Sequence, residues 1–144
     1  MATVFDVAAY ILKNHGPMTA MKLQKLVYYS QAWSLVWDER PLFRAQIQAW
    51  ANGPVVPALY EHHRGKFRVS RSDFPNANPN SLTRDEKETV QAVLSHYGNK
   101  TSQQLSDLTH SERPWKEARG GLSPGVRGRT PITRSAIAEY YESL

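Results

Sequence analysis

Residues 18–38 read MTAMKLQKLVYYSQAWSLVWD, and this stretch decides the predicted fold. At about 100° per residue, its apolar side chains would cover two faces of one helix and leave little of the circumference polar. The clearly polar positions are Lys22, Gln24, Lys25 and Gln31. The side chains that we expect to be most deeply buried are Leu23, Leu26, Val27 and Tyr28. A helix that is apolar on two faces belongs in the interior, so we expect the other elements to pack around it.

The flanking residues define where this central helix begins. Thr19 is a good N-cap because its hydroxyl can accept from a free amide of the first turn, and Gly16-Pro17 interrupts whatever precedes it. Thr3 is the expected cap of a first helix that ends at residues 14–16. Because the connection between these two helices is short, we expect them to pack as a helical hairpin.

One stretch has the alternation that is typical of a strand. Residues 42–50, LFRAQIQAW, alternate between two sets of side chains, which favours a strand or an extended segment. Residues 52–54, Asn-Gly-Pro, predict a turn, and Pro57 suits the first position of a short helix. A second short strand at residues 67–69 is the expected partner of the first.

The second half of the chain predicts further helices. Their expected N-caps are Thr83, Ser102, Ser111 and Thr133. Thr83 begins a capping box, and its helix is expected to end at Gly98 in a left-handed conformation. Two polar, glycine- or proline-containing stretches are predicted loops, residues 72–81 and 120–128.

These elements predict a single domain that spans residues 1–144. Its fold class is mainly α, a helical bundle around a central helix with a small extended or β element. With 144 residues, 40% apolar and 22% charged, the chain has the composition of an ordinary globular protein. No apolar run approaches the roughly 18 residues that span a bilayer. The absence of cysteine excludes disulfides and thiolate nucleophiles. We therefore expect a cytoplasmic protein that does not enter a membrane.

Glu61-His62-His63 is the nearest approach to a catalytic or metal-binding cluster. Adjacent residues of a helix point about 100° apart, so His62 and His63 do not readily converge on one ion. His110 is followed by a serine and a glutamate, but no geometry joins the three as a triad. The chain also has no phosphate-binding glycine motif and no nucleophile elbow. We therefore predict no enzyme activity, no bound metal and no cofactor.

Basic residues outnumber acidic ones, 18 against 13, which gives a formal charge of +5. One basic group lies at residues 64–71 and a richer one at residues 113–134. Such a charge favours an acidic partner, either nucleic acid or protein. No helix-turn-helix pair is recognisable, so sequence-specific nucleic-acid binding is not favoured.

Several motifs together resemble one known family. In chain order they are KLQKLVYYSQAW, PLF, IQAWANGPVVPALY and the run from LSDLTH to RPW, followed by a terminal helix with Ile and Tyr. They resemble the Panacea family, also described as the SocA-like or GepA-like, phage-associated antitoxin domain. The positions that match by motif are Leu23, Lys25, Leu26, Tyr28, Tyr29, Gln31, Pro41, Leu42, Phe43, Ala49, Trp50, Gly53, Pro54, Val55, Pro57, Tyr60, Thr109, His110, Pro114 and Trp115.

This resemblance implies a mainly helical domain from bacterial and phage toxin–antitoxin modules. Such a domain neutralises a cognate toxin, encoded by a neighbouring gene, by direct protein–protein binding. Because one relative delivers its toxin to a protease, a proteolytic adaptor is an alternative function. A nucleic-acid-binding transcriptional regulator that uses the basic C-terminal half is another.

If one scaffold serves toxins of unrelated folds, the shared motif builds the scaffold and exposed side chains beside it select the toxin. Aromatic and arginine side chains usually dominate the binding energy at interfaces. The predicted partner-binding residues are therefore Trp50, Tyr60, His63, Arg64, Arg113, Trp115 and Arg119.

Overall fold

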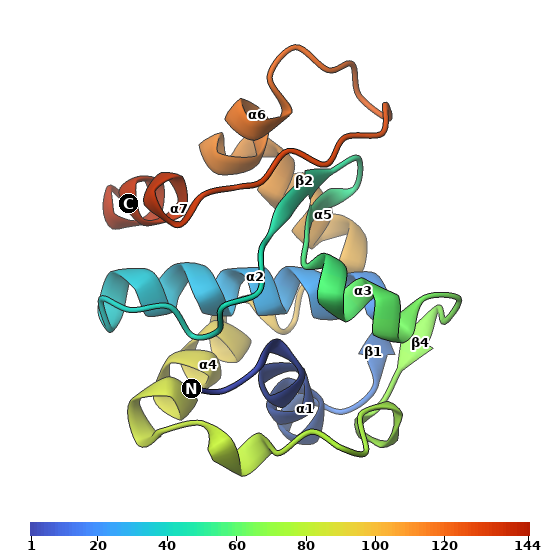
Figure 1. Cartoon of the computed structure of the whole chain (residues 1–144), viewed down its shortest axis with the longest axis vertical. Coiled ribbons are helices and arrows are strands. Elements are labelled where there is room, and N and C mark those ends of the chain that lie inside the picture. Colours follow the sequence, from blue (N-terminus) through green and yellow to red (C-terminus); the bar gives the residue numbers. More distant parts are fainter.

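The computed structural model describes residues 1–144 and is mainly helical, as predicted (Figure 1). The seven α-helices are α1 (Val4–His15), α2 (Ala20–Trp37), α3 (Pro57–His63), α4 (Arg84–Tyr97), α5 (Ser102–Ser111), α6 (Arg113–Arg119) and α7 (Arg134–Glu142). The four short strands are β1 (Met18–Thr19), β2 (Gln48–Trp50), β3 (Gly53–Val55) and β4 (Arg68–Val69). The strands form two separate antiparallel pairs. No helix combines the length and the apolar character that a membrane span needs.

Five of the seven helices begin where a threonine side chain accepts from a free backbone amide. Thr3, Thr19, Thr83 and Thr133 are N-caps, as predicted. The predictions for Ser102 and Ser111 are each wrong by one residue. Thr101 caps α5 because Gln104 reaches back to its amide and completes a capping box. Glu112 is the residue before α6.

Two predicted features at the ends of elements also differ. Gly98 has φ −62° and continues the right-handed helix, because its amide donates to the carbonyl of Leu94. The left-handed conformation predicted there is therefore wrong. The predicted loop at residues 72–81 overlaps two single-turn 3-10 helices, η1 (Arg71–Asp73) and η2 (Pro79–Ser81).

Helix α2 is buried along most of its length and runs across the middle of the molecule in Figure 1. Helices α1 and α4 pack on one side of it, and α5, α7 and the β2–β3 hairpin pack on the other. Leu23, Leu26 and Val27 have no solvent exposure, and Tyr28 is 1% exposed. The predicted burial of these four residues is confirmed. Each such side chain contributes roughly 1.5–3 kcal/mol to stability through burial.

The three long polar side chains Gln24, Lys25 and Gln31 of α2 are buried as well, as are the hydroxyls of Ser30 and Ser34. Gln31 accepts from the amide of Leu42 at 2.7 Å and donates to the carbonyl of Phe43 at 2.9 Å. Gln24 accepts from the amide of Val56 at 2.9 Å. The two glutamines therefore satisfy backbone groups of extended segments that would otherwise need a neighbouring strand.

At residues 42–50 we predict a strand or an extended segment, and the strand alternative is wrong for most of that length, since only Gln48–Trp50 forms β2. The backbone at Leu42 and Phe43 is already satisfied by Gln31, which removes the need for strand pairing there. The predicted pairing of the second strand is also wrong. Strand β4 pairs with β1 rather than with β2. Because β1 directly precedes α2, this pairing places β4 beside the start of α2.

Strand β2 has a partner on both edges. Strand β3 forms an antiparallel hairpin with it on one edge. On the other edge, the amide of Ala49 donates to the carbonyl of Thr130 at 2.8 Å. The predicted turn at residues 52–54 begins earlier, because Gly53 already belongs to β3. The additional bridge from Gln48 to Pro131 thus ties the hairpin to a segment 83 residues further along the chain.

Candidate functional site

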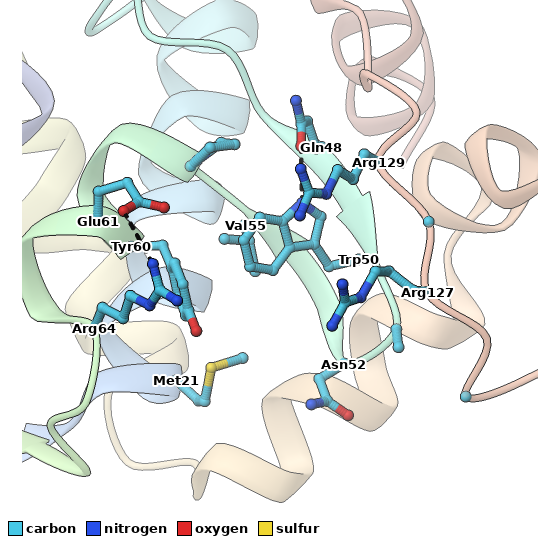
Figure 2. A pocket seen from close by; sticks show the side chains of 14 residues that line it. Met21, Gln48, Trp50, Asn52, Val55, Tyr60, Glu61, Arg64, Arg127 and Arg129 are labelled. Carbon is cyan, nitrogen blue, oxygen red and sulfur yellow. Dashed lines mark hydrogen bonds and ion pairs between the residues drawn. The ribbon is translucent and has the colours of Figure 1, made fainter.

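A groove of about 560 Å³ opens between the β2–β3 hairpin, α3 and the loop that joins α6 to α7 (Figure 2). We call it the basic groove. Its principal lining residues are Met21, Gln48, Trp50, Val55, Tyr60, Glu61, Arg64, Arg127 and Arg129. This volume lies within the roughly 300–1,000 Å³ that is usual for binding pockets. The lining combines apolar, aromatic and basic side chains, which suits a partner of mixed character.

The hairpin forms the floor of the basic groove. Trp50 Nε1 donates to Gln48 Oε1 at 2.8 Å, which fixes the orientation of the indole along the strand. The ring of Tyr60 from α3 meets the Trp50 ring edge to face, with the centroids 4.9 Å apart. A pair of this kind is worth about 0.5–1.5 kcal/mol beyond its burial. The two partly exposed rings therefore form one ordered aromatic surface.

Helix α3 forms one wall. Pro57 begins this helix, where its missing amide costs no hydrogen bond. Tyr60, Glu61 and Arg64 line the groove from the following turns (Figure 2). Arg64 lies 3.7 Å from Glu61, and both side chains are well exposed, so this ion pair contributes less than about 1 kcal/mol. Arg64 can therefore exchange Glu61 for the carboxylate of a partner at little cost.

The loop between α6 and α7 forms the opposite wall and carries Arg127 and Arg129 (Figure 2). Arg119, which is 5% exposed, holds this loop in position. Its guanidinium donates to the carbonyl of Val126 at 2.6 Å and to the carbonyl of Ala49 at 3.4 Å. One buried side chain thus links the loop to β2. The loop wall therefore keeps a defined position relative to the floor of the groove.

Side chains of α5 and α6 hold the hairpin. Trp115 Nε1 donates to the carbonyl of Trp50 at 2.8 Å, and the Ser106 hydroxyl donates to the carbonyl of Asn52 at 2.8 Å. The Trp115 ring stacks on the ring of His110, with the centroids 3.9 Å apart. The position of the groove floor therefore depends on α5 and α6, which lie more than 50 residues away in the sequence.

The predicted partner-binding residues fall into three sets. Those that line the basic groove are Trp50, Tyr60 and Arg64. Those that support the groove or the core beside it are His63, Trp115 and Arg119. Arg113 lies apart from the lining residues of the groove.

His63 and Arg113 show how differently the remaining candidates are placed. His63 is 2% exposed, and its Nε2 accepts from Gln24 Nε2 at 3.0 Å. Burial lowers the pKa of His63, which agrees with a neutral ring. The exposed Arg113 lies 3.9 Å from Glu117 and 5.3 Å from the centre of the Tyr140 ring. Only Arg113 of these two is open to a partner.

Arg127 and Arg129 line the groove but were not among the predicted contacts. The sequence places them only within a basic group, in a stretch whose glycines predict a loop. The pairing of Ala49 with Thr130, which brings this loop to the hairpin, joins residues with no shared local pattern. Alternating arginines in a glycine-rich loop were the only signal in the sequence.

Lys25, Gly53, Thr109 and His110 gather at the hairpin turn, and we call this set the lysine corner. Gly53 has φ +122°, and a Cβ at this position would lie 2.6 Å from Lys25 Cε and 3.0 Å from Thr109 Oγ1. The positive φ therefore favours glycine at this position, and a Cβ there would also force the buried Lys25 side chain to shift. Lys25 Nζ and His110 Nε2 are buried and have no hydrogen-bond partner. Burial lowers the pKa of Lys25 to about 7. Burial and the nearby charge of Lys25 also lower the pKa of His110.

Tyr28, Tyr29, Glu112 and Tyr141 form a second buried polar set, the tyrosine–glutamate network. Glu112 Oε1 accepts from the hydroxyl of Tyr29 at 2.7 Å and from that of Tyr141 at 2.8 Å. The hydroxyls of Tyr28 and Tyr141 lie 3.0 Å apart. Burial raises the pKa of Glu112, and the two hydroxyl donors oppose this effect in part. Through Glu112, which directly precedes α6, the network joins α2 to α7.

No three His, Cys, Asp or Glu side chains lie together where they could hold a metal ion. His62 and His63 diverge, as expected for neighbours on a helix. His62 Nε2 donates to the carbonyl of Asp73 at 2.7 Å, whereas His63 faces Gln24. What the groove offers a partner is ionic, aromatic and hydrogen-bonding contact.

The sequence of this chain matches a known protein family and is similar to a curated relative. Residues 23–116 match the family described as "Antitoxin SocA-like, Panacea domain". The chain is also similar to Antitoxin SocA of Caulobacter vibrioides (strain NA1000 / CB15N), with 30% identity over 121 residues. That alignment covers 76% of this chain and 63% of the relative, so the chain spans less than two thirds of the relative's length. No solved structure is a significant match.

The matched segment contains the hairpin, α3 and the lysine corner, and it ends in α6. Arg127 and Arg129 lie beyond it. The match covers well over half of the chain and includes the motif blocks, which confirms the resemblance seen in the sequence. The chain therefore belongs to the SocA-like antitoxin family, whose members carry the Panacea domain.

Proposed function

We propose that the chain is an antitoxin that neutralises a cognate toxin by binding it directly. The observation that carries this proposal is the family match over residues 23–116. The similarity to a protein named Antitoxin SocA agrees with it over the region that the two chains share. A neighbouring gene encodes the toxin in this proposal.

The chemistry of the basic groove supports direct binding. Trp50 and Tyr60 offer an aromatic surface, and Arg64 offers an exposed cation that is only weakly paired. Tryptophan, tyrosine and arginine are the residue types that most often carry the binding energy of protein interfaces. A surface of this kind loses little conformational entropy on binding, because the rings are already held against each other.

The predicted partner-binding residues have two roles in this proposal. Trp50, Tyr60, Arg64 and Arg113 contact the toxin, since each is at least partly exposed. His63, Trp115 and Arg119 position the groove through the hydrogen bonds described above. Substitution of the second set therefore weakens toxin binding through the shape of the groove rather than through a lost contact.

Neutralisation by binding needs no catalytic step, so we infer that the chain acts without turnover. We also propose that residues 1–144 act as a single domain, a helical bundle in which the elements packed on α2 hold the hairpin in place. In such a domain the rigid core fixes the binding surface before the partner arrives, which reduces the cost of association.

Co-expression with the product of the neighbouring gene tests the proposal. The chain should restore growth, and a tagged copy should retain the toxin in a pull-down. Arg64→Ala should weaken both effects, because it removes a cation from the groove. Arg84→Ala is the matched control, since its side chain on α4 is 91% exposed and does not line the groove. Absence of both rescue and complex with the unaltered chain would contradict the antitoxin proposal.

A further inference from the structure

We propose that the basic groove binds an acidic segment of the partner protein, one that carries apolar side chains between its carboxylates. This inference rests on the proposed function, because it states which chemistry of the toxin the antitoxin holds. It is carried by the charge of the groove, by its apolar lining and by the position of its two walls.

The charge of the groove is complementary to carboxylates. Arg64 approaches from α3, and Arg127 and Arg129 approach from the opposite wall (Figure 2). Glu61 is the one acidic residue in the lining. Neither Arg127 nor Arg129 has an ion-pair partner within the chain. A guanidinium can donate two parallel hydrogen bonds to one carboxylate, so three of them facing one groove favour a segment with several acidic residues.

The apolar part of the groove favours a protein over a nucleic acid. Met21 and Trp50 line it as partly exposed side chains, next to the ring of Tyr60, whereas Val55, also in the lining, is buried. On the loop that carries the two arginines, outside the groove lining, Leu122 and Val126 are 41% and 45% exposed. A phosphate backbone would leave these exposed apolar side chains without a partner. A peptide that alternates acidic and apolar side chains can satisfy both sets.

One wall of the groove lies within the segment that matches the family, and the other wall lies outside it. The floor and the α3 wall lie within residues 23–116, and the wall with Arg127 and Arg129 lies outside. The buried side chain of Arg119 joins this outer wall to β2. The loop can therefore change its exposed residues while its anchor remains, which is a simple way to alter the partner without altering the scaffold.

Affinity measurements with the purified product of the neighbouring gene test this inference. We expect Arg127→Glu and Arg129→Glu each to weaken binding at least tenfold, because each places a like charge against the acidic segment. Both residues are exposed and outside the core, so the variants should keep the circular dichroism spectrum and melting temperature of the unaltered chain. Arg84→Glu makes the same charge change on α4 and should alter affinity less than twofold.

A charge exchange then identifies the segment. Hydrogen exchange on the toxin, with and without the antitoxin, should show protection of a stretch that contains acidic residues. Substitution of those acidic residues by lysine should weaken the binding of the toxin to the unaltered chain. The same lysine variant should bind Arg127→Glu at least tenfold more tightly than the unaltered toxin does. Protection confined to a stretch without acidic residues, or no recovery in the exchanged pair, would overturn the inference.

The outcomes separate the two proposals. If the unaltered chain does not bind the toxin, the antitoxin proposal fails, and the groove inference fails with it. If the complex forms but the groove variants bind as tightly as Arg84→Glu, only the groove inference fails. Binding of a duplex DNA oligonucleotide that is lost in Arg127→Glu, with toxin binding unchanged, would assign the groove to nucleic acid. Self-association lost in the same variant would assign it to a second copy of this chain.

Discussion

The tyrosine–glutamate network and the lysine corner both lie against α2, yet their polar atoms are satisfied very differently. In the network, one carboxylate oxygen of Glu112 accepts from two tyrosine hydroxyls. In the corner, Lys25 Nζ and His110 Nε2 have no partner. A buried polar group costs stability unless it is hydrogen-bonded. The network therefore stabilises the packing of α2, whereas the corner reduces stability at the hairpin turn.

This difference shows that residues that shape a binding surface need not be the ones that stabilise the fold. The stem of Lys25 occupies the space that a side chain at Gly53 would fill. Gly53 follows Asn52, which lines the basic groove, so the corner determines how the hairpin turn sits. Substitutions in the network and in the corner should separate these two contributions.

Gly53→Ala should have the largest effect, a loss of about 2–6 kcal/mol of unfolding free energy. Alanine is strained at the positive φ of this position, and its Cβ would clash with Lys25. Each of these two effects costs about 1–3 kcal/mol. Chemical denaturation should show that the loss is smaller in the Lys25→Ala background, because the clash is then relieved. Equal losses in both backgrounds would show that Lys25 does not restrict this position.

Leu26→Ala should cost about 2–5 kcal/mol, since it removes a fully buried side chain from the helix that carries both polar sets. Urea denaturation followed by circular dichroism gives the value. Leu122→Ala, at a position that is 41% exposed, is the control and should cost much less. A loss below half a kilocalorie for Leu26→Ala, roughly the level of a surface change, would contradict the central place of α2 in the core.

Tyr29→Phe should cost about 1.5–3 kcal/mol, the usual range for a hydrogen bond to a charged group. The substitution removes one of the two donors to Glu112 but keeps the ring and its stacking on Tyr97 at 4.1 Å. Tyr10→Phe is a matched control, because the Tyr10 hydroxyl accepts a hydrogen bond from Gln91, which is exposed and uncharged. Similar losses for the two variants would mean that the network has no special role.

Lys25→Met should have the opposite sign and raise stability by about 1–3 kcal/mol at pH 7, because it replaces an unpaired buried amine with an apolar side chain of similar length. Thermal and chemical denaturation measure the change. A loss of stability would show that Lys25 finds a hydrogen-bond partner in solution, and it would remove the contrast between the two polar sets.

The pH dependence of Lys25→Met sharpens this test. Between about pH 7 and 10.5, the unfolded lysine binds a proton that the folded one does not, so unfolding free energy rises with pH. The slope is at most about 1.4 kcal/mol per pH unit. The advantage of Lys25→Met should therefore be largest below about pH 7 and shrink as the pH rises toward 10.5. Because His63 and His110 also have lowered pKa values, the difference between the two proteins is the quantity to measure.

Features that depend on neighbours in the sequence were predicted well. Thr3, Thr19 and Thr83 cap helices as expected, because a cap needs only a side-chain oxygen and a free amide two or three residues later. The burial of Leu23, Leu26 and Val27 in α2 was likewise predicted from their spacing alone, although the same spacing wrongly included Trp37, which is 51% exposed. The polar positions of the same helix were not, because Gln24, Lys25 and Gln31 are buried by segments that arrive from elsewhere.

The candidate site was predicted in part for the same reason. Residue type alone identified Trp50, Tyr60 and Arg64 as candidates, and the three line one groove. Residue type did not separate them from Trp115 and Arg119, whose polar atoms are used on backbone carbonyls. That distinction depends on which carbonyls the folded chain brings within reach.

The amino-acid sequence determined the helical class, most helix starts and the family, because each of these depends on residue types at short or fixed spacing. The tertiary structure alone decided that β4 pairs with β1, that two glutamines replace strand partners, and that a loop with two arginines faces the hairpin. These features require contacts between segments far apart in the chain. Such contacts depend on the packing of the whole molecule, for which no local pattern in the sequence is a substitute.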